Sequence, residues 1–257
     1  MVLQTNQLLH LDYDSTAYLG FVFSSTVCSY NFHWYLTPNA IGENDRAYWT
    51  QHHKKLHIAL FLLGLIGSAY FFFYFIESWF WMAVPVMLTF LYSAPKLSHW
   101  PFHLLRKIAI GKTLFLTFVW MYVTALLPVI LDKQPLSAAD VLFCCSRFFL
   151  IYAICILFDY RDRENDKREG IKSMITLLNE KGVDRLFYGS LLIFLISTVG
   201  LYTCGFPPLI LICLLIPGVI VLALFKNAKR NFSDYLYYFV LDGLMMFSAL
   251  FTFFIRF

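Results

Sequence analysis

Residues 158–170 read Phe-Asp-Tyr-Arg-Asp-Arg-Glu-Asn-Asp-Lys-Arg-Glu-Gly and directly follow a long apolar run. If the helix of that run continues, its step of about 100° places Asp159, Asp162 and Asp166 on one face. Carboxylates this close repel one another unless cations lie between them. Mg²⁺ suits such ligands, because proteins usually hold it through one or two carboxylates and phosphate oxygens of a substrate. The stretch therefore predicts a Mg²⁺ site for a phosphorylated ligand; the alternative is a solvated, mixed-charge helix end.

Basic residues surround this acidic run and supply the opposite charge. Arginine and lysine recognise phosphate oxygens through charge-assisted hydrogen bonds. We therefore expect a diphosphate to bind beside the run. The basic residues nearest to it are Arg161, Arg163, Lys167, Arg168 and Lys172.

The composition of the 257-residue chain is that of a membrane protein. It is 60% hydrophobic and only 14% charged, whereas soluble domains contain about 25% charged residues, and its mean hydropathy is +0.65. These values predict an all-α polytopic bundle in a lipid bilayer and give no reason to expect a nucleic-acid partner. The length suits one membrane-embedded domain over residues 1–257. The six cysteines lie in apolar runs without a Cys-x-x-Cys pair, so we expect buried free thiols.

Eight apolar runs are long enough to span a bilayer of about 30 Å. Tight turns are expected between neighbouring runs at Glu77-Ser78 and at Gly205-Phe206-Pro207-Pro208. A further segment, Val2–Leu9, is too short to span and is interpreted as the tail of another helix. The eight runs fall near residues 15–36, 56–76, 79–94, 108–131, 138–158, 186–204, 207–225 and 234–255.

Positive charge is concentrated in four connecting segments, which hold 16 of the 20 Lys and Arg residues. Positively charged loops stay in the cytoplasm, so we expect these segments, and the acidic run with them, to face the cytoplasm. The predicted location is the plasma membrane, crossed several times. The four segments are 37–55, 95–107, 159–185 and 226–233.

The acidic run, at the end of the fifth expected span and followed by Gly170-Ile171, resembles the second acidic motif of the UbiA superfamily of integral-membrane prenyltransferases. The segment Tyr92-Ser93-Ala94-Pro95-Lys96 is similar to the family's YxxxK element, in the expected loop. The resemblance covers most of the chain. Family members have nine helices, so the eight runs would correspond to helices two to nine. The implied fold is a bundle around a central cavity that opens to the cytoplasmic side.

The resemblance also implies roles for individual residues. Asp159, Asp162 and Asp166 are expected to hold Mg²⁺, while Tyr92 and Lys96 contact the diphosphate or the leaving oxygen; these five are the catalytic candidates. Alternative roles are membrane anchors for basic side chains, a helix cap for asparagine and a packed, hydrogen-bonded ring for histidine. The candidates for substrate binding are Asn31, His33, Arg106, Lys112 and Arg161.

The family's first acidic motif, Asn-Asp-x-x-Asp-x-x-x-Asp, is not kept in this chain. If Asn31 is its asparagine, Phe32, Tyr35 and Asn39 stand at the three acidic positions. Two later carboxylates would replace the lost ones only if the loop folds back. These are Glu43 and Asp45.

Two other groups of polar residues have open interpretations. His53 and His57 form an i, i+4 pair that is able to bind a metal, but an interfacial loop rich in histidine is the favoured interpretation, because no carboxylate lies at the spacing of a hydrolytic zinc site. Arg147 and Asp242 fall near mid-membrane, where charges are expensive and usually paired. We therefore expect an Arg147–Asp242 ion pair.

Together with the resemblance, these features predict a membrane prenyltransferase. It would transfer an isoprenyl group from an isoprenyl diphosphate to a small hydrophobic acceptor, aromatic or not, with assistance from Mg²⁺. Bound metal would stabilise the charge that develops on the leaving diphosphate. The alternative, suggested by the degenerate first motif, is a catalytically impaired homologue that binds or carries polyprenyl lipids.

Overall fold

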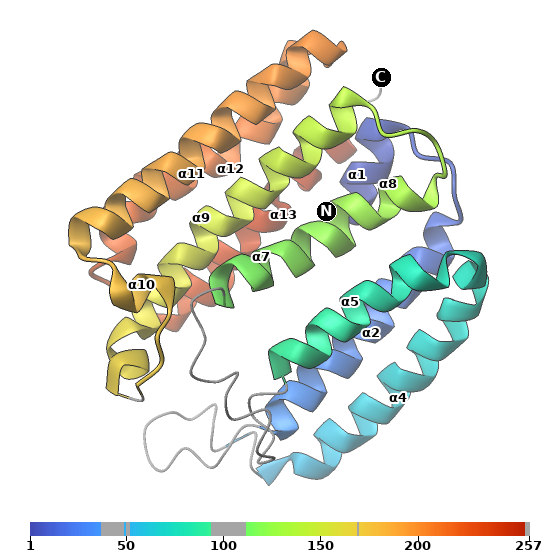
Figure 1. The fold of residues 1–257 in the computed structure, drawn as a ribbon, viewed down its shortest axis with the longest axis horizontal. Helices are drawn as coiled ribbons and strands as arrows, with labels where there is room; N and C mark the ends of the chain where they lie inside the picture. Colours follow the sequence, from blue (N-terminus) through green and yellow to red (C-terminus); the bar gives the residue numbers. More distant parts are fainter. Residues whose placement is uncertain (37–48, 50–51, 94–111, 169, 255–257) are drawn as a thin grey trace. The chain divides into compact units, whose positions relative to one another are not determined.

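The computed structural model describes residues 1–36, 49, 52–93, 112–168 and 170–254, with the backbone alone for 91–93 and 112 (Figure 1). Over these residues the chain is helical or in turns and loops, without a strand. Contacts divide it into two units: unit 1 comprises Met1–Asp12 and Lys107–Phe257, and unit 2 comprises Tyr13–Arg106. That both units belong to one membrane domain stays a prediction.

Each of the eight apolar runs contains a helix, which confirms the predicted all-α polytopic bundle. Among the described residues, six stretches are long and apolar enough to cross a membrane. One of them, Lys54–Phe90, covers two of the predicted runs. Another predicted run, 15–36, forms a helix that is rich in serine and threonine and is not among the six. The predicted central cavity stays a prediction.

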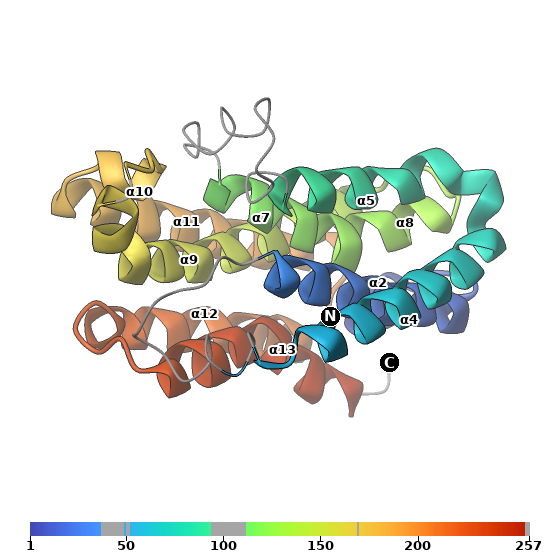
Figure 2. The same cartoon turned by 90° about the horizontal axis from the view of Figure 1, so that it is seen from below.

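Unit 1 is arranged around a long helix, α9 (Ala138–Arg168). It packs against α7 (Lys112–Met121), α11 (Glu180–Gly200), α12 (Pro208–Ala228) and α13 (Asp242–Phe253). Figure 2 shows α12 and α13 in a second layer beside the layer of α9 and α11. The remaining elements of this unit are α1 (Val2–Leu9), η4 (Tyr122–Leu126), α8 (Leu127–Leu131), α10 (Met174–Leu177), η5 (Leu201–Cys204) and η6 (Tyr235–Leu241).

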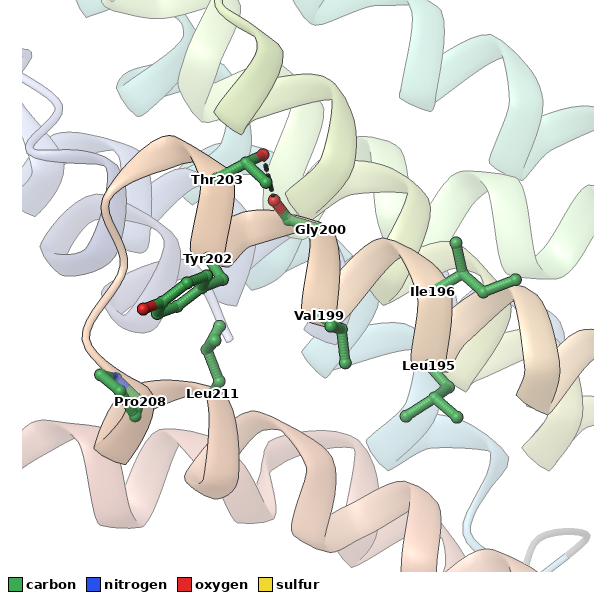
Figure 3. Close-up of a pocket in the computed structure, with 8 residues that line it drawn as sticks. All are labelled: Leu195, Ile196, Val199, Gly200, Tyr202, Thr203, Pro208 and Leu211. Carbon is green, nitrogen blue, oxygen red and sulfur yellow. Dashed lines mark hydrogen bonds between the residues drawn. The ribbon is translucent and has the colours of Figure 1, made fainter.

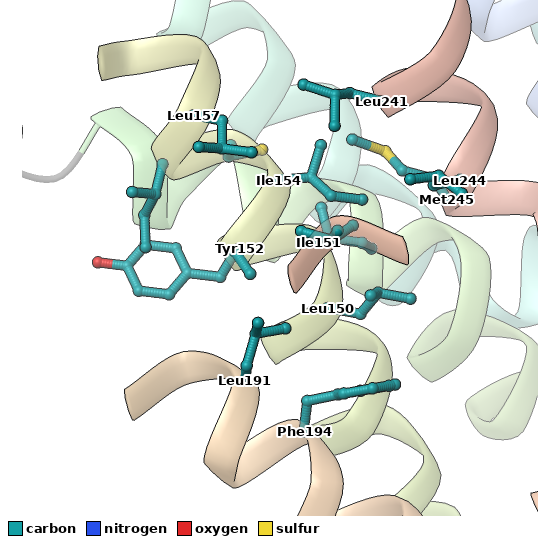
Figure 4. Packing of buried hydrophobic residues seen from close by; sticks show 14 of the residues in the cluster. Leu150, Ile151, Tyr152, Ile154, Leu157, Leu191, Phe194, Leu241, Leu244 and Met245 are labelled. Atoms are coloured by element: carbon teal, nitrogen blue, oxygen red, sulfur yellow. The ribbon is translucent and has the colours of Figure 1, made fainter. Parts of the chain in front are cut away.

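The middle of α9 forms the core of unit 1, because its side chains are buried on all sides. Leu150, Ile151, Ile154 and Leu157 are fully buried, and side chains of α11, η6 and α13 close around them (Figure 4). In a bilayer, lipid is as apolar as leucine, so helices associate through close packing and interhelical hydrogen bonds. Such a core holds α9, and the acidic run at its end, in a fixed position.

A hydrogen bond from α1 compensates for Pro128, which lies within the helical stretch Thr113–Leu131 of unit 1. Pro128 has no N–H, so the carbonyl of Thr124, four residues earlier, loses its helical donor. The Thr5 hydroxyl donates to this carbonyl at 2.7 Å. The Gln4 amide donates to the Thr252 hydroxyl of α13 at 3.1 Å. The short segment Val2–Leu9 is therefore a buried part of unit 1.

The deepest charge in unit 1 belongs to Arg147, which is fully buried in α9. Its guanidinium donates to the hydroxyls of Ser248 and Ser146 at 3.2 and 3.1 Å and lies over the rings of Phe143 and Phe194. The predicted ion pair with Asp242 is therefore wrong within the described part of the chain. Asp242 begins α13 and lies six residues before Ser248, about 9 Å away along the helix.

Unit 2 is a helical hairpin with an additional helix. α2 (Ser15–Tyr35) packs along α4 (Lys54–Phe72), and the 3₁₀ segment η1 (Phe73–Ser78) turns the chain into α5 (Trp79–Ser93). The chain reverses at η1 (Figure 1), which confirms the predicted turn. Gly64 allows the close approach of α2 and α4, since a Cβ there would lie 2.6 Å from the backbone nitrogen of Cys28. The hydroxyls of Ser25 and Ser68 join the same helices at 3.1 Å.

Candidate functional site

The acidic run forms the last three turns of α9, so the helix continues beyond the apolar run as expected. Gly170 follows its end with a φ of 70°, a left-handed conformation that glycine adopts without steric cost. The N–H of Ile171 then closes the end by donating to the carbonyl of Asp166 at 2.8 Å. The three aspartates therefore share one rigid helix face.

Asp159 is the aspartate nearest the core and is buried. One of its carboxylate oxygens accepts a hydrogen bond from the hydroxyl of Thr113, in the first turn of α7. Thr113 is itself buried, and its carbonyl accepts from the Thr117 hydroxyl at 2.8 Å. A buried carboxylate held by a neutral hydroxyl keeps its negative charge available for a cation.

Asp162 is half exposed and is held by its neighbour Arg161. The Nε of Arg161 donates to Asp162 at 2.9 Å, and an Nη donates to the hydroxyl of Tyr238 at the same distance. The guanidinium also lies 4.8 Å from the ring centres of both Tyr237 and Tyr238. Arg161, predicted to contact phosphate, is thus fixed within an aromatic box beside a carboxylate.

Asp166 is buried, like Asp159, and lies two turns further along the helix, about 10 Å away. One ion therefore does not bind to both. Among the residues that the structure describes, no three His, Cys, Asp or Glu side chains are grouped to hold a metal ion. Carboxylates spaced along a face still fit Mg²⁺ that is completed by phosphate oxygens, because each ion then needs only one or two protein ligands.

A network of charges fixes the end of α9 to the neighbouring helices. Arg163 forms an ion pair with Glu180, at the start of α11, and the Tyr160 hydroxyl donates to the same carboxylate at 3.1 Å. Lys229, just after α12, donates to Glu180 and to Asp184, at 2.8 Å each. These contacts occupy Arg163, one of the basic side chains that the sequence predicted beside the diphosphate.

The other predicted site residues belong to unit 2, begin α7 of unit 1 or lie outside the described residues. Asn31 and His33 are near the end of α2, where the Asn31 side-chain oxygen lies 2.8 Å from Nδ1 of His57. The structure gives the backbone alone for Tyr92 and Lys112. The predicted residues outside the described part are Lys96, Arg106, Glu43 and Asp45.

A pocket of about 740 Å³ in unit 1 lies at the opposite end of α9 from the acidic run (Figure 3). Its lining is apolar and comes from α11, η5 and α12. Gly200 lines this pocket, and a Cβ at that position would lie 3.4 Å from the side chain of Leu142 in α9. Leu142 is about 25 Å from Asp159 along the helix. This pocket therefore does not belong to the acidic site.

Comparison with known proteins decides the family. The sequence model of the UbiA prenyltransferase family matches residues 50–250. The chain belongs to the UbiA prenyltransferase family. No curated protein and no solved structure matches it.

Membership in the UbiA family confirms the resemblance and gives a membrane prenyltransferase-like function in general terms. Prenyltransferases of this family generally use Mg²⁺, and the family implies isoprenyl diphosphates as substrates and a lipid membrane as surroundings. The chain is thus an integral membrane protein.

Three residues of these sites have roles that the sequence did not indicate. Thr113 and Tyr238 bind side chains of the acidic run from other helices, and neither belongs to a motif. From the sequence, His57 is either half of a metal-binding pair with His53 or part of an interfacial loop rich in histidine; in the structure it contacts Asn31. His53 instead contacts the carbonyl of Trp49 at 2.7 Å, so the two histidines do not form a metal site.

Proposed function

We propose that this UbiA protein transfers an isoprenyl group from an isoprenyl diphosphate to a small hydrophobic acceptor. The observation that supports it is the rigid helix face of α9 that carries Asp159, Asp162 and Asp166, two of them buried. The hydroxyl of Thr113 donates a hydrogen bond to Asp159 and helps to hold its carboxylate on this face. Carboxylates spaced along one helix face suit Mg²⁺ whose coordination is completed by phosphate oxygens.

In this proposal the three aspartates hold Mg²⁺ with the diphosphate of the donor. When bound, Mg²⁺ supplies Lewis-acid stabilisation of charge on the leaving diphosphate. Arg161 contributes positive charge at the same face, and its hydrogen bonds to Asp162 and Tyr238 orient it. The family resemblance makes Tyr92, Lys96, Arg106 and Lys112 the further candidates for diphosphate contacts. The concentration of basic residues in the connecting segments favours a cytoplasmic position for this site.

The direct test is diphosphate release by the purified full chain in lipid nanodiscs. We expect geranylgeranyl diphosphate or a longer donor to release diphosphate when Mg²⁺ and a hydroxy-aromatic acceptor are present, and chelation by EDTA to stop the release. The absence of release with every donor and acceptor, together with tight binding of prenyl diphosphate without Mg²⁺, would overturn the proposal. That result would favour a protein that binds or carries polyprenyl lipids.

A further inference from the structure

Two pairs of basic side chains are exposed at one end of unit 1, on neighbouring helices. Lys181 and Arg185 are four residues apart in the first turns of α11, and Lys226 and Arg230 are four residues apart at the end of α12. Among the described contacts, none of these four side chains forms a hydrogen bond or an ion pair. Their positive charge is therefore available to a ligand.

The carboxylates near these cations do not neutralise them. Glu180 and Asp184, on α11, are both held by Lys229 at 2.8 Å, as part of the network at the end of α9. Asp234, four residues after Arg230, forms no ion pair with it in the described part of the chain. The surface around the four cations thus stays positive and favours an anionic group.

Exposed apolar side chains continue from these cations along one face of α11. Tyr188, Leu192 and Ile196 follow Arg185 at intervals of three or four residues, so all of them lie on one side of the helix. Each of the three is exposed. Tyrosine is frequent where a membrane meets water, and exposed aliphatic side chains suit its hydrocarbon core. This face of α11 therefore has the order of a lipid: charge, interface and hydrocarbon.

α12 repeats this order beside α11. Leu222 and Val219 precede Lys226 at intervals of four and three residues, and both are exposed. The ring of Phe225, in the same part of α12, lies 5.3 Å from that of Tyr188 on α11. The two helices therefore present their cations and their apolar side chains at the same levels.

The apolar pocket of about 740 Å³ lies further along the same two helices and is lined by both (Figure 3). Ile196, in its wall, is about 16 Å from Arg185 along α11. This distance is close to half of a bilayer core of about 30 Å. An acyl chain whose headgroup lies at Arg185 therefore reaches the pocket with its end.

We propose that this face of α11 and α12 binds one anionic phospholipid, from the leaflet on the side of the acidic run. The headgroup phosphate accepts hydrogen bonds from the two pairs of cations, and the acyl chains lie along the exposed apolar side chains. Basic clusters between helices at a membrane surface bind anionic headgroups in this way. A zwitterionic lipid carries its own cation, so the surface should distinguish lipids by charge. The inference does not depend on prenyl transfer.

The test compares two lipids with the same chains, dioleoylphosphatidylglycerol and dioleoylphosphatidylcholine. Native mass spectrometry of the full chain in detergent measures how much of each lipid stays bound. We expect one phosphatidylglycerol per chain, with phosphatidylcholine binding about tenfold more weakly. Soluble glycerol phosphate, which lacks the chains, should not displace the lipid. Equal affinity for the two lipids, or displacement by glycerol phosphate, would overturn the proposal.

A pair of double variants assigns the binding to this face. Lys181→Gln with Arg185→Gln should weaken phosphatidylglycerol binding about tenfold to thirtyfold, with phosphatidylcholine unaffected. The matched control, Lys54→Gln with Lys55→Gln, removes the same charge at two exposed lysines of unit 2 and should leave both affinities unchanged. Equal losses in the two double variants would mean a general attraction of charges, and the site would be wrong.

The second helix supplies an independent check. Lys226→Gln with Arg230→Gln should cause a loss similar to that of the α11 variant, because one headgroup contacts both helices. If the α12 variant had no effect, the shared site would be contradicted. The comparison of the two lipids on the unmodified chain needs no variant and remains decisive if a variant does not fold.

Discussion

The polar residues of unit 1 and unit 2 differ in charge, although both lie at the ends of tightly packed helices. The end of α9 carries three aspartates with arginines between them, and Asp159 and Asp166 are buried. The corresponding polar pair of unit 2, Asn31 and His57, has no carboxylate among its hydrogen-bond partners in the described chain. A charged face recruits cations and phosphates, whereas an amide–imidazole pair selects neutral donors.

The two units therefore offer different chemistry to a ligand. In unit 1 the carboxylates suit the metal-bound diphosphate of the donor. In unit 2 the described pocket is lined by apolar side chains, and no carboxylate lies in its lining. Substitutions in each unit should accordingly affect different kinetic constants.

The largest effect is expected from Asp159→Asn. It keeps the shape of the side chain and removes the charge that would hold Mg²⁺, so Mg²⁺-dependent release of diphosphate should fall by roughly 10²- to 10³-fold, since metal assistance contributes several kcal/mol. The matched control is Glu164→Gln, in the same run, whose carboxylate is exposed and pairs with Lys167. A similar loss in both variants would mean that general charge at the helix end, and not the buried face, supports activity.

A large effect on stability is expected from Gly64→Ala in unit 2. The new Cβ would lie 2.6 Å from the nitrogen of Cys28 and 2.8 Å from the carbonyl oxygen of Ser24, both backbone atoms that cannot rotate away. Overpacking of this kind costs about 1–3 kcal/mol, which exceeds the gain of about 1 kcal/mol from replacing glycine in a helix. The free energy of unfolding should therefore decrease.

Gly189→Ala in α11 is the control for this substitution, because a Cβ there meets no atom within 4 Å. Thermal unfolding in detergent should show a lower Tm for Gly64→Ala and an equal or higher Tm for Gly189→Ala. If both variants had the same Tm, close approach of α2 and α4 would not stabilise the hairpin that holds His57.

The positions of the helices and the acidic face could be predicted from the sequence, because both depend on local spacing. Apolar runs set the helices, and the intervals between Asp159, Asp162 and Asp166 set their common face. The tight turn at Gly205 is likewise a local property, since its φ of 89° favours glycine.

Partners from distant parts of the chain could not be predicted, because they depend on how helices align against one another. Thr113 reaches Asp159 only when α7 and α9 pack in one register. Arg147 meets Ser248 and not Asp242 because α13 presents a residue six positions later at that depth. Sequence spacing within one helix carries no information about either contact.

A moderate effect is expected from Tyr238→Phe in unit 1. The variant removes the hydroxyl that accepts from Arg161 and leaves the ring on which the guanidinium lies. The hydrogen bond contributes about 1 kcal/mol, so the KM of the prenyl diphosphate should rise about twofold to fivefold, with the KM of the acceptor unchanged. Tyr235→Phe, at an exposed tyrosine stacked on Phe239, is the control. An increase in the KM of the acceptor alone would contradict the division between units.

The smallest effect is expected from Lys229→Met, which removes a cation of the network without touching the acidic face. Partial burial acts to lower the pKa of Lys229, but hydrogen bonds to Asp184 and Glu180 outweigh it and raise the pKa above its usual value. Because the pKa is raised on folding, the stabilisation is complete below the unfolded pKa of about 10.4 and is lost as pH rises through the folded pKa. Partly exposed pairs contribute about 1 kcal/mol or less.

We therefore expect Lys229→Met to lower the Tm by about 2–4 °C at neutral pH, and this difference should shrink at alkaline pH, above about pH 10.4. Lys226→Met, at an exposed lysine one turn earlier, should leave the Tm unchanged. Diphosphate release should stay near the wild-type rate in both variants, since neither lysine contacts Asp159, Asp162 or Asp166 in the described hydrogen bonds. A loss of activity comparable to that of Asp159→Asn would show that the network positions the acidic face, and unit 1 would then depend on all of its charges together.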